Sequence, residues 1–187
     1  ATVALIWCLA TSDKMRRAVK AAEAAWSAGP HPDLAAAFDG LGDENEAPLD
    51  RVKRFQRLCS FRPEHSESHY ALAEASLAAH LWGEARRHLE ATGGDNPTAR
   101  HCRLMAELEE KETGNLEVTR QWLDRAVAAP QGESWYCNEC GSIAGHWTPG
   151  CNSCGAFDGL EWQLPPGVVA LPPAAIVPAL TASDTEK

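Results

Sequence analysis

Two short cysteine motifs carry the clearest chemistry in the sequence. They read Cys137-Asn138-Glu139-Cys140-Gly141 and Cys151-Asn152-Ser153-Cys154-Gly155, with ten residues between the inner cysteines. Four thiolates can surround one metal ion tetrahedrally, and two tight turns present them in pairs. A glycine after each second cysteine lets the backbone adopt a positive φ, so that amide N–H groups point at the sulfurs. The spacing therefore predicts one metal site with the ligands Cys137, Cys140, Cys151 and Cys154.

The metal in this predicted site is expected to be one structural Zn²⁺, because all four positions are protein ligands and none is left open for water. Iron takes the same four-thiolate set, so the sequence does not separate the two metals. A disulfide pair or a catalytic Cys-x2-Cys is the remaining alternative, and two tandem motifs fit it less well. His146 lies between the motifs. Because four cysteines complete the shell, we expect His146 at the surface or around the ligands.

Three further cysteines, Cys8, Cys59 and Cys102, stand outside this spacing. Each falls on or beside the apolar stripe of an expected helix, where a free cysteine commonly packs as a small buried hydrophobe. We therefore expect all three to be buried thiols. Metal-bound thiolates together with unpaired cysteines indicate a reducing, cytosolic setting.

The elements that must position the cysteines fall into three regions. Residues 1–131 are rich in Ala, Leu, Glu and Arg, with apolar residues at helical spacing. Residues 132–164 hold the cysteine motifs, and because about 30 residues cannot build a sufficient core, metal binding must supply folding energy. Residues 165–187 are rich in Pro and Ala, and are expected to be extended or disordered. The apolar shell of the cysteine module is expected to come from Trp135, Tyr136, Trp147, Phe157 and Trp162.

Helical periodicity and capping residues predict the helices of the first region. Ser12 is expected to cap a helix that runs to about residue 28 and buries Met15, Val19, Ala22 and Trp26. Further helices are expected over residues 32–41, 50–60, 66–80, 83–91, 98–113 and 116–129.

A repeat period underlies these helices. Ala85 and Leu89 follow Ala73 by 12 and 16 residues, the spacing of small and large positions in a tetratricopeptide repeat. A step of 34 residues takes Leu89 forward to Leu123 and back to Phe55. Small residues let paired helices approach, and large ones fill the groove between pairs. We expect an all-α, tetratricopeptide-like superhelix of helix pairs followed by a small zinc ribbon. An irregular bundle is the alternative.

Charge and composition exclude several classes of protein. The formal net charge of -9 argues against nucleic-acid binding. Four thiolates with one divalent metal would take that charge to about -11. The longest apolar run, Ala1–Ala10, is about half of the roughly 20 residues that span a bilayer. It resembles the second half of a cut helix pair, so we expect a soluble fragment of a longer protein. The sequence contains no phosphate loop or nucleophile elbow, which indicates a non-enzymatic protein.

Several stretches of the sequence carry a family resemblance. The helical region contains Trp26, Pro30-His31-Pro32-Asp33-Leu34, Ala71-Leu72-Ala73-Glu74-Ala75, Leu81-Trp82-Gly83-Glu84-Ala85-Arg86 and Leu104-Met105-Ala106-Glu107-Leu108-Glu109. The ending contains Trp135-x-Cys137-x2-Cys140, Trp147 and Cys151-x2-Cys154-Gly155-x-Phe157-Asp158-x-Leu160-x-Trp162. From about residue 1 to Trp162, the chain resembles the C-terminal part of alphaproteobacterial HemY proteins.

This resemblance implies tetratricopeptide repeats at the cytoplasmic face of the bacterial inner membrane, anchored by two N-terminal helices that are missing here. It also implies a link to late haem biosynthesis. The order of repeats followed by a rubredoxin-like metal module is also similar to that of LapB. In LapB the module packs on the repeats, and the protein regulates lipopolysaccharide assembly. Our interpretation is a non-enzymatic protein–protein interaction scaffold. The alternatives are a LapB-like regulator, an iron electron-transfer protein and a haem-binding protein.

The expected binding surface is the concave face of the repeats, which the first helix of each pair lines. The alternative is a solvated helical face held by pairs four residues apart, such as Arg103–Glu107. A basic stretch over residues 51–62 is expected to be solvated, with an acidic partner or anionic headgroups as its alternative. The residues predicted to bind a partner protein are Glu67, Tyr70, Glu74, Arg100, Arg103 and Glu107. The basic residues are Arg51, Lys53, Arg54, Arg57 and Arg62.

Haem is an alternative ligand, although no motif in the sequence supports it. Four histidines gather around one expected helix pair and are candidate axial ligands, namely His65, His69, His80 and His88. Histidines near helix ends more often cap the helix or face solvent.

Overall fold

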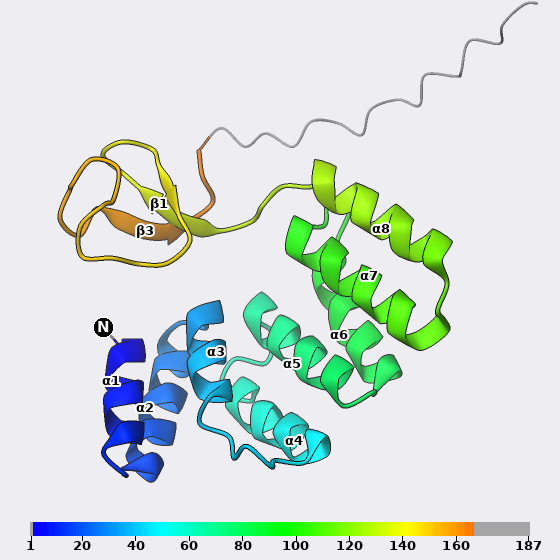
Figure 1. Ribbon diagram of the computed structural model, residues 1–187, viewed down its shortest axis with the longest axis horizontal. Coiled ribbons are helices and arrows are strands. Elements are labelled where there is room, and N and C mark those ends of the chain that lie inside the picture. Colours follow the sequence, from blue (N-terminus) through cyan, green and yellow to red (C-terminus); the bar gives the residue numbers. More distant parts are fainter. Residues whose placement is uncertain (1, 167–187) are drawn as a thin grey trace, which may run out of the picture. The chain divides into compact units, whose positions relative to one another are not determined.

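The computed structural model describes residues 2–166, so the expected extended or disordered tail over residues 165–187 lies almost wholly outside the described residues. The chain divides into two compact units, Ala1–Ala126 and Val127–Lys187. Helices make up the first unit, and a small sheet with the cysteine motifs makes up the second (Figure 1). The expectation of a mostly helical fold with a small cysteine-bearing module at the C-terminal end is confirmed.

The part of the chain that the structure describes contains eight helices, whose positions agree closely with the predicted ones. They are α1 (Thr2–Thr11), α2 (Met15–Ala28), α3 (Pro32–Asp39), α4 (Pro48–Cys59), α5 (Ser66–Ala78), α6 (Trp82–Gly93), α7 (Ala99–Thr113) and α8 (Leu116–Ala128).

Two helices begin at a histidine cap. The His31 Nδ1 accepts a hydrogen bond from the Asp33 N–H at 3.0 Å, and the His65 Nδ1 accepts one from the Glu67 N–H at 3.1 Å. Each bond satisfies a backbone donor that has no partner within its helix. Pro32 suits the first turn of α3 because no N–H is needed there.

The start of α2 differs from the prediction. Ser12 does not cap this helix, because its hydroxyl donates to the Cys8 carbonyl of α1 at 2.7 Å. The residue before α2 is Lys14, which makes no side-chain cap. Met15, expected on the buried face, is 43% exposed, while Ala22 and Trp26 are buried as predicted.

One hydrophobic core gathers side chains from α1 to α5. Trp26 is fully buried, and its Nε1–H donates to the Ser68 hydroxyl at 3.1 Å. Phe38 meets Phe55 edge-on, with ring centroids 5.6 Å apart. Burial of one such aromatic side chain stabilises the fold by about 2–3 kcal/mol. The bond to Ser68 avoids the cost of a buried indole N–H without an acceptor.

A second core lies between α5, α6 and α7. Ala73 and Ala85 are fully buried in this core, which α5 and α6 share, and Leu89 and Leu108 are fully buried beside them. The small side chains allow the two helix backbones to approach closely.

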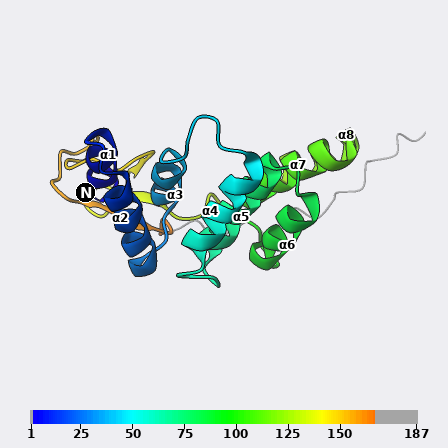
Figure 2. The same ribbon diagram turned by 90° about the horizontal axis from the view of Figure 1, so that it is seen from below.

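Helices α1 to α7 pack mainly on helices near them in the sequence, as Figures 1 and 2 show. Arg54 of α4 contacts α3, because its guanidinium donates to the Phe38 carbonyl at 2.6 Å. The rings of His101 in α7 and Trp122 in α8 meet with centroids 6.1 Å apart. Contacts of this kind join each helix to its neighbours in chain order.

The three cysteines outside the metal motifs have different surroundings. Cys59 and Cys102 are buried, as predicted. Burial raises the pKa of the Cys59 thiol to about 12. The prediction for Cys8 is wrong, since this residue is exposed. Helix α1 is apolar on every side, so its sequence does not distinguish the buried face, which carries Ile6, from the outer one.

The second unit is built on an antiparallel sheet with the strand order β2-β1-β3. Its strands are β1 (Ser134–Cys137), β2 (Ile143–Ala144) and β3 (Leu160–Gln163). Trp135 pairs with Ala144 on one side and with Trp162 on the other. The two tryptophan rings meet edge-on at 5.4 Å. Cys137 ends the central strand, so the sheet fixes the start of the first metal motif.

A histidine pair joins α5 to α6. The Nδ1 atoms of His69 and His88 lie 3.0 Å apart. Arg87 lies 3.2 Å from the His88 Nε2 and can only donate, so this nitrogen carries no proton. His88 therefore donates from Nδ1 to His69. Burial, together with the charges of Arg87 and His69, lowers the pKa of His88 to about 4, against the opposing effect of Glu84.

We expect His88 to make the helical unit less stable in acid. An unfolded histidine has a pKa of about 6.5. The unfolded chain therefore binds more protons than the folded chain between about pH 4 and 6.5, and stability falls as the pH decreases through this range. The expected loss in the free energy of unfolding is roughly 2 kcal/mol, measured by urea denaturation. His88→Gln should flatten this dependence, whereas His146→Gln, at an exposed site, should not. Equal slopes in wild type and His88→Gln would contradict the prediction.

Candidate metal centre

Two knuckles, residues 137–141 and 151–155, present the four cysteines of the second unit. In each knuckle the glycine N–H donates to the carbonyl of the first cysteine, both at 2.8 Å. Gly141 and Gly155 have φ values of +74° and +77°. This left-handed conformation strains residues with a Cβ but not glycine. The positive φ expected at both glycines is confirmed.

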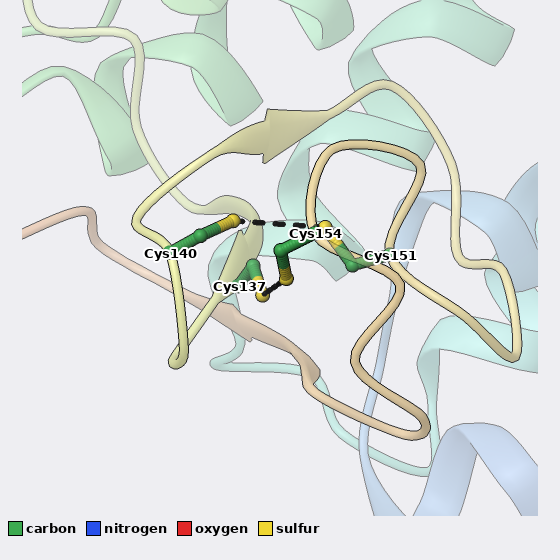
Figure 3. A group of neighbouring side chains, drawn as sticks. All are labelled: Cys137, Cys140, Cys151 and Cys154. Atoms are coloured by element: carbon green, nitrogen blue, oxygen red, sulfur yellow. Dashed lines mark hydrogen bonds between the residues drawn. The ribbon is translucent and has the colours of Figure 1, made fainter.

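The four sulfur atoms face a common point (Figure 3). The Sγ atoms of Cys137 and Cys154 lie 3.8 Å apart, as do those of Cys140 and Cys151. All four lie within 4.8 Å of one another. A tetrahedron with metal–sulfur bonds of about 2.3 Å has edges of about 3.8 Å, whereas a disulfide needs sulfurs about 2.05 Å apart. The four cysteines are therefore positioned to bind a single metal ion.

The ligands differ in their exposure to solvent. Cys137 and Cys151 are buried, and Cys140 and Cys154 are exposed. Each knuckle thus contributes one inner and one outer sulfur, with the first cysteine of the motif on the inside.

A small apolar core supports the inner ligands. It consists of the two buried cysteines and Leu160, with Trp135 and Trp147 packed against them. The prediction that Phe157 belongs to the apolar shell of this module is wrong, because this residue is 84% exposed. It lies in the loop after the second knuckle, where its backbone bridges to Gly150 and its ring turns to solvent.

Hydrogen-bond donors favour the thiolate form at two of the ligands. The Ser142 hydroxyl, followed by the Ser142 N–H, lowers the pKa of Cys140. The same hydroxyl, with the N–H groups of Cys154 and Ser153, lowers the pKa of Cys151 to about 6. The thiolate is the form that binds a metal.

Cys154 shows why this group of sulfurs needs a cation. The Ala156 N–H lowers the pKa of Cys154, but the sulfur of Cys140, burial and the other two sulfurs outweigh it and raise this pKa to about 12. Thiolates this close repel one another, so one of them retains its proton until a cation compensates the charge.

The sequence did not single out Ser142, although its hydroxyl touches two ligands. Its Oγ lies 3.2 Å from the Cys140 Sγ and 3.3 Å from the Cys151 Sγ. The signal available in the sequence is its position directly after Gly141.

Four of the residues predicted to bind a partner protein interact with one another. Arg100 of α7 donates to both carboxylate oxygens of Glu67 at 2.9 and 2.8 Å, and to Glu74 at 2.9 Å. Its guanidinium carbon lies 4.5 Å from the centroid of the Tyr70 ring. Glu67 and Tyr70 are each only 7% exposed. These four side chains tie α5 to α7.

The other two predicted residues lie further along α7. Arg103 is exposed, and Glu107 pairs with Lys111 at 2.7 Å. Arg100, Arg103 and Glu107 share one face of the helix, because they are three and four residues apart.

A groove of about 360 Å³ in the helical unit includes Glu74 and Arg100 of this predicted surface in its lining. Alanine and Phe55 side chains contribute its apolar part, and the arginines at its border are paired. Arg51 donates to both Asp39 oxygens at 2.7 and 2.9 Å. The lining comes from four helices and consists of Pro32, Ala35, Ala36, Asp39, Arg51, Phe55, Ala71, Glu74 and Arg100.

The basic stretch of α4 is largely neutralised by neighbouring carboxylates. Arg54 pairs with Glu46 at 2.7 Å and Arg57 with Glu23 at 2.9 Å. Lys53 pairs with Asp50 within the helix at 2.8 Å, and Arg62, after α4, is exposed.

The candidate haem ligands all have protein partners. His65 caps α5, and the ring of His80 lies 5.0 Å from that of Trp82. His69 and His88 bond to each other through Nδ1. His146, between the knuckles, is exposed.

Within residues 2–166, no helix has both the length and the apolar character needed to cross a bilayer.

Comparison with known proteins shows similarity over most of this chain. The chain is 36% identical over 136 residues to a probable magnetosome protein, Mms48, of Magnetospirillum gryphiswaldense. The match covers 72% of this chain and 30% of that protein, so the chain spans less than a third of its relative. No protein-family profile matches the chain, and no solved structure matches it.

We expect Cys154→Ser to abolish stable metal binding and to unfold the second unit, because a four-thiolate site supplies folding energy to a module with so small a core. Elemental analysis of purified protein should fall from one metal ion per chain to nearly none. Circular dichroism should keep its helical signal, since the helices have their own cores. Cys8→Ser, at an exposed cysteine outside the site, is the matched control and should keep the metal. Unchanged metal content in Cys154→Ser would rule out the site.

Proposed function

We propose that this chain is a non-enzymatic scaffold, in which a tetratricopeptide-like superhelix binds partner proteins and a rubredoxin-like zinc ribbon has a structural role. The observation that carries the proposal is the groove lined by four different helices. A surface built by several successive helix pairs is the usual binding site of a repeat solenoid.

Packing supports the assignment of repeats. If α1, α3, α5 and α7 are the first helices of four pairs, then first helices of successive pairs meet where α1 packs on α3 and α3 on α5, and the helices of the pairs α1–α2 and α5–α6 pack on each other. Side chains at the period of 34 residues occupy equivalent helices, with Phe55 in α4 and Leu89 in α6 both buried. Leu123 in α8 is 47% exposed, the state of a groove-filling residue at the end of a stack.

The charges around the groove limit what can bind there. Arg51 and Arg100 are both bonded to carboxylates, so the groove offers paired charges around an apolar floor. A partner is therefore recognised mainly by shape and apolar contact, with Arg103 as a cation outside the paired cluster.

We assign zinc to the four-cysteine centre because two outer and two inner thiolates complete a tetrahedral shell. Iron in the same shell would make the second unit an electron carrier. We expect aerobically purified protein to be colourless and to contain one zinc per chain. A red protein with visible charge-transfer bands, from cells supplied with both metals, would instead favour iron.

The wider setting is part of the proposal. The resemblance to HemY proteins is the support for a scaffold at the cytoplasmic face of the inner membrane, in a process linked to late haem biosynthesis, and a LapB-like role in lipopolysaccharide assembly is the alternative. The similarity to a probable magnetosome protein favours a third setting, in magnetosomes. The identity of the captured partners distinguishes these settings.

We expect changes in the groove to remove the partner. Ala36→Trp would fill the groove from an exposed position, and Arg103→Glu would reverse the nearby charge. Each should reduce recovery of crosslinked partners from the native cells by about tenfold, the effect of losing roughly 1.4 kcal/mol of binding. Ala24→Trp on α2 and Arg120→Glu on α8, both exposed and outside the groove, are the matched controls. Equal recovery with all four variants would contradict binding at the groove.

A further inference from the structure

The two knuckles repeat one backbone design. The Cys137 N–H donates to the Ser142 carbonyl, and the Cys151 N–H donates to the Ala156 carbonyl, both at 2.9 Å. With the matching glycine conformations, these bonds make Ser142 and Ala156 equivalent positions, each directly after the glycine of its knuckle. The two positions differ in their side chains, one with a hydroxyl and the other with a methyl group.

That hydroxyl lies between sulfurs of different knuckles. The Ser142 Oγ is 3.2 Å from the outer sulfur of Cys140 and 3.3 Å from the inner sulfur of Cys151. A thiolate only accepts hydrogen bonds, so with the cysteines ionised the hydroxyl must donate its proton to one of these two sulfurs. Ala156 has no proton to donate in this way to Cys154.

We propose that Ser142 is a positioning residue of the metal centre, whose hydroxyl strengthens metal binding by joining the two knuckles and makes Cys140 less reactive than Cys154. This inference rests on the proposed metal centre.

The effect on affinity follows from charge. A tetrathiolate site concentrates negative charge, and a hydroxyl within reach of two of its sulfurs stabilises the charged form by donating its proton to one of them. Removal of a partner of this kind typically lowers metal affinity 10- to 100-fold.

The effect on reactivity follows from exposure. Cys140 and Cys154 are the two exposed ligands, so reagents in solution reach them first. Cys140 accepts from the Ser142 N–H and lies within hydrogen-bond distance of the Ser142 hydroxyl, whereas Cys154 accepts from the Ala156 N–H. Donation to a thiolate withdraws electron density and makes the sulfur a weaker nucleophile. Cys154 is therefore the ligand at which an electrophile first attacks.

Metal affinity is the first test. We expect Ser142→Ala to lower the Zn²⁺ affinity of the full chain by at least about tenfold, measured by competition with a chelator of known affinity. Ser142→Thr keeps the hydroxyl and should retain most of the affinity. Ser153→Ala makes the same chemical change at an exposed serine of the second knuckle, whose backbone N–H is preserved, and should match wild type.

The order of alkylation is the second test, and a merely structural role for Ser142 would not change it. Iodoacetamide reacts when a thiolate attacks its CH₂ group, so that an S–C bond forms, the C–I bond breaks and iodide leaves. In the zinc-loaded wild type, mass spectrometry should find Cys154 labelled several times faster than Cys140. In Ser142→Ala the two rates should converge.

The outcomes separate this inference from the metal centre itself. A wild-type chain that binds no zinc overturns both. Zinc binding by the wild type with equal affinity in Ser142→Ala and Ser153→Ala, or faster labelling of Cys140 than of Cys154, overturns the role of Ser142 and leaves the centre in place.

Discussion

Repulsion between four thiolates is the constraint on which the second unit depends. Its core contains few fully buried side chains, and two of them, Cys137 and Cys151, are themselves candidate ligands. Ordinary burial of apolar area therefore supplies little stability, and the sulfurs cannot all ionise at distances below 5 Å without a cation. The raised pKa of Cys154 expresses this repulsion directly. The knuckle glycines, the N–H donors and the Ser142 hydroxyl all serve to hold negative charge at one point, where a metal ion converts the repulsion into attraction.

The helical unit differs from the second unit, because its cores are apolar and its charged side chains form ion pairs between helices. Arg100 of α7 joins Glu67 and Glu74 of α5, and Arg51 of α4 joins Asp39 of α3, so that ion pairs link different helices. Such half-buried pairs contribute little net stability compared with apolar contacts, yet loss of one partner leaves a buried charge uncompensated. Their main effect is to fix how consecutive helices sit beside one another, while residues such as Trp26 and Leu89 supply the stability.

Sequence patterns predicted those features of the structure that depend on residues close together in the chain. The knuckles depend on spacing within a few residues, so the ligands, the glycine conformations and most helix ends were readable from the sequence. Features set by distant parts of the chain were not. Ser142 touches Cys151 only because the second knuckle folds over the first, and Tyr70 is covered because Arg100 of α7 crosses it. Cys8 was expected to be buried because α1 is apolar all round, and a helix without a polar side gives no sign of which face turns outward.

The pairing of the arginines at the groove determines how the proposed scaffold must recognise its partner. A concave face lined by free charges would attract partners over a distance and lose affinity steeply with salt. In this chain the arginines at the groove are already bonded to carboxylates, and a partner that competed for them would have to break bidentate pairs. Specificity then comes from the shape of a floor of small side chains, in which an added side chain such as tryptophan at Ala36 removes the space itself. Alanines thus serve two purposes in this unit, because Ala73 and Ala85 allow helices to pack closely and Ala35, Ala36 and Ala71 line the recess in which a partner can bind.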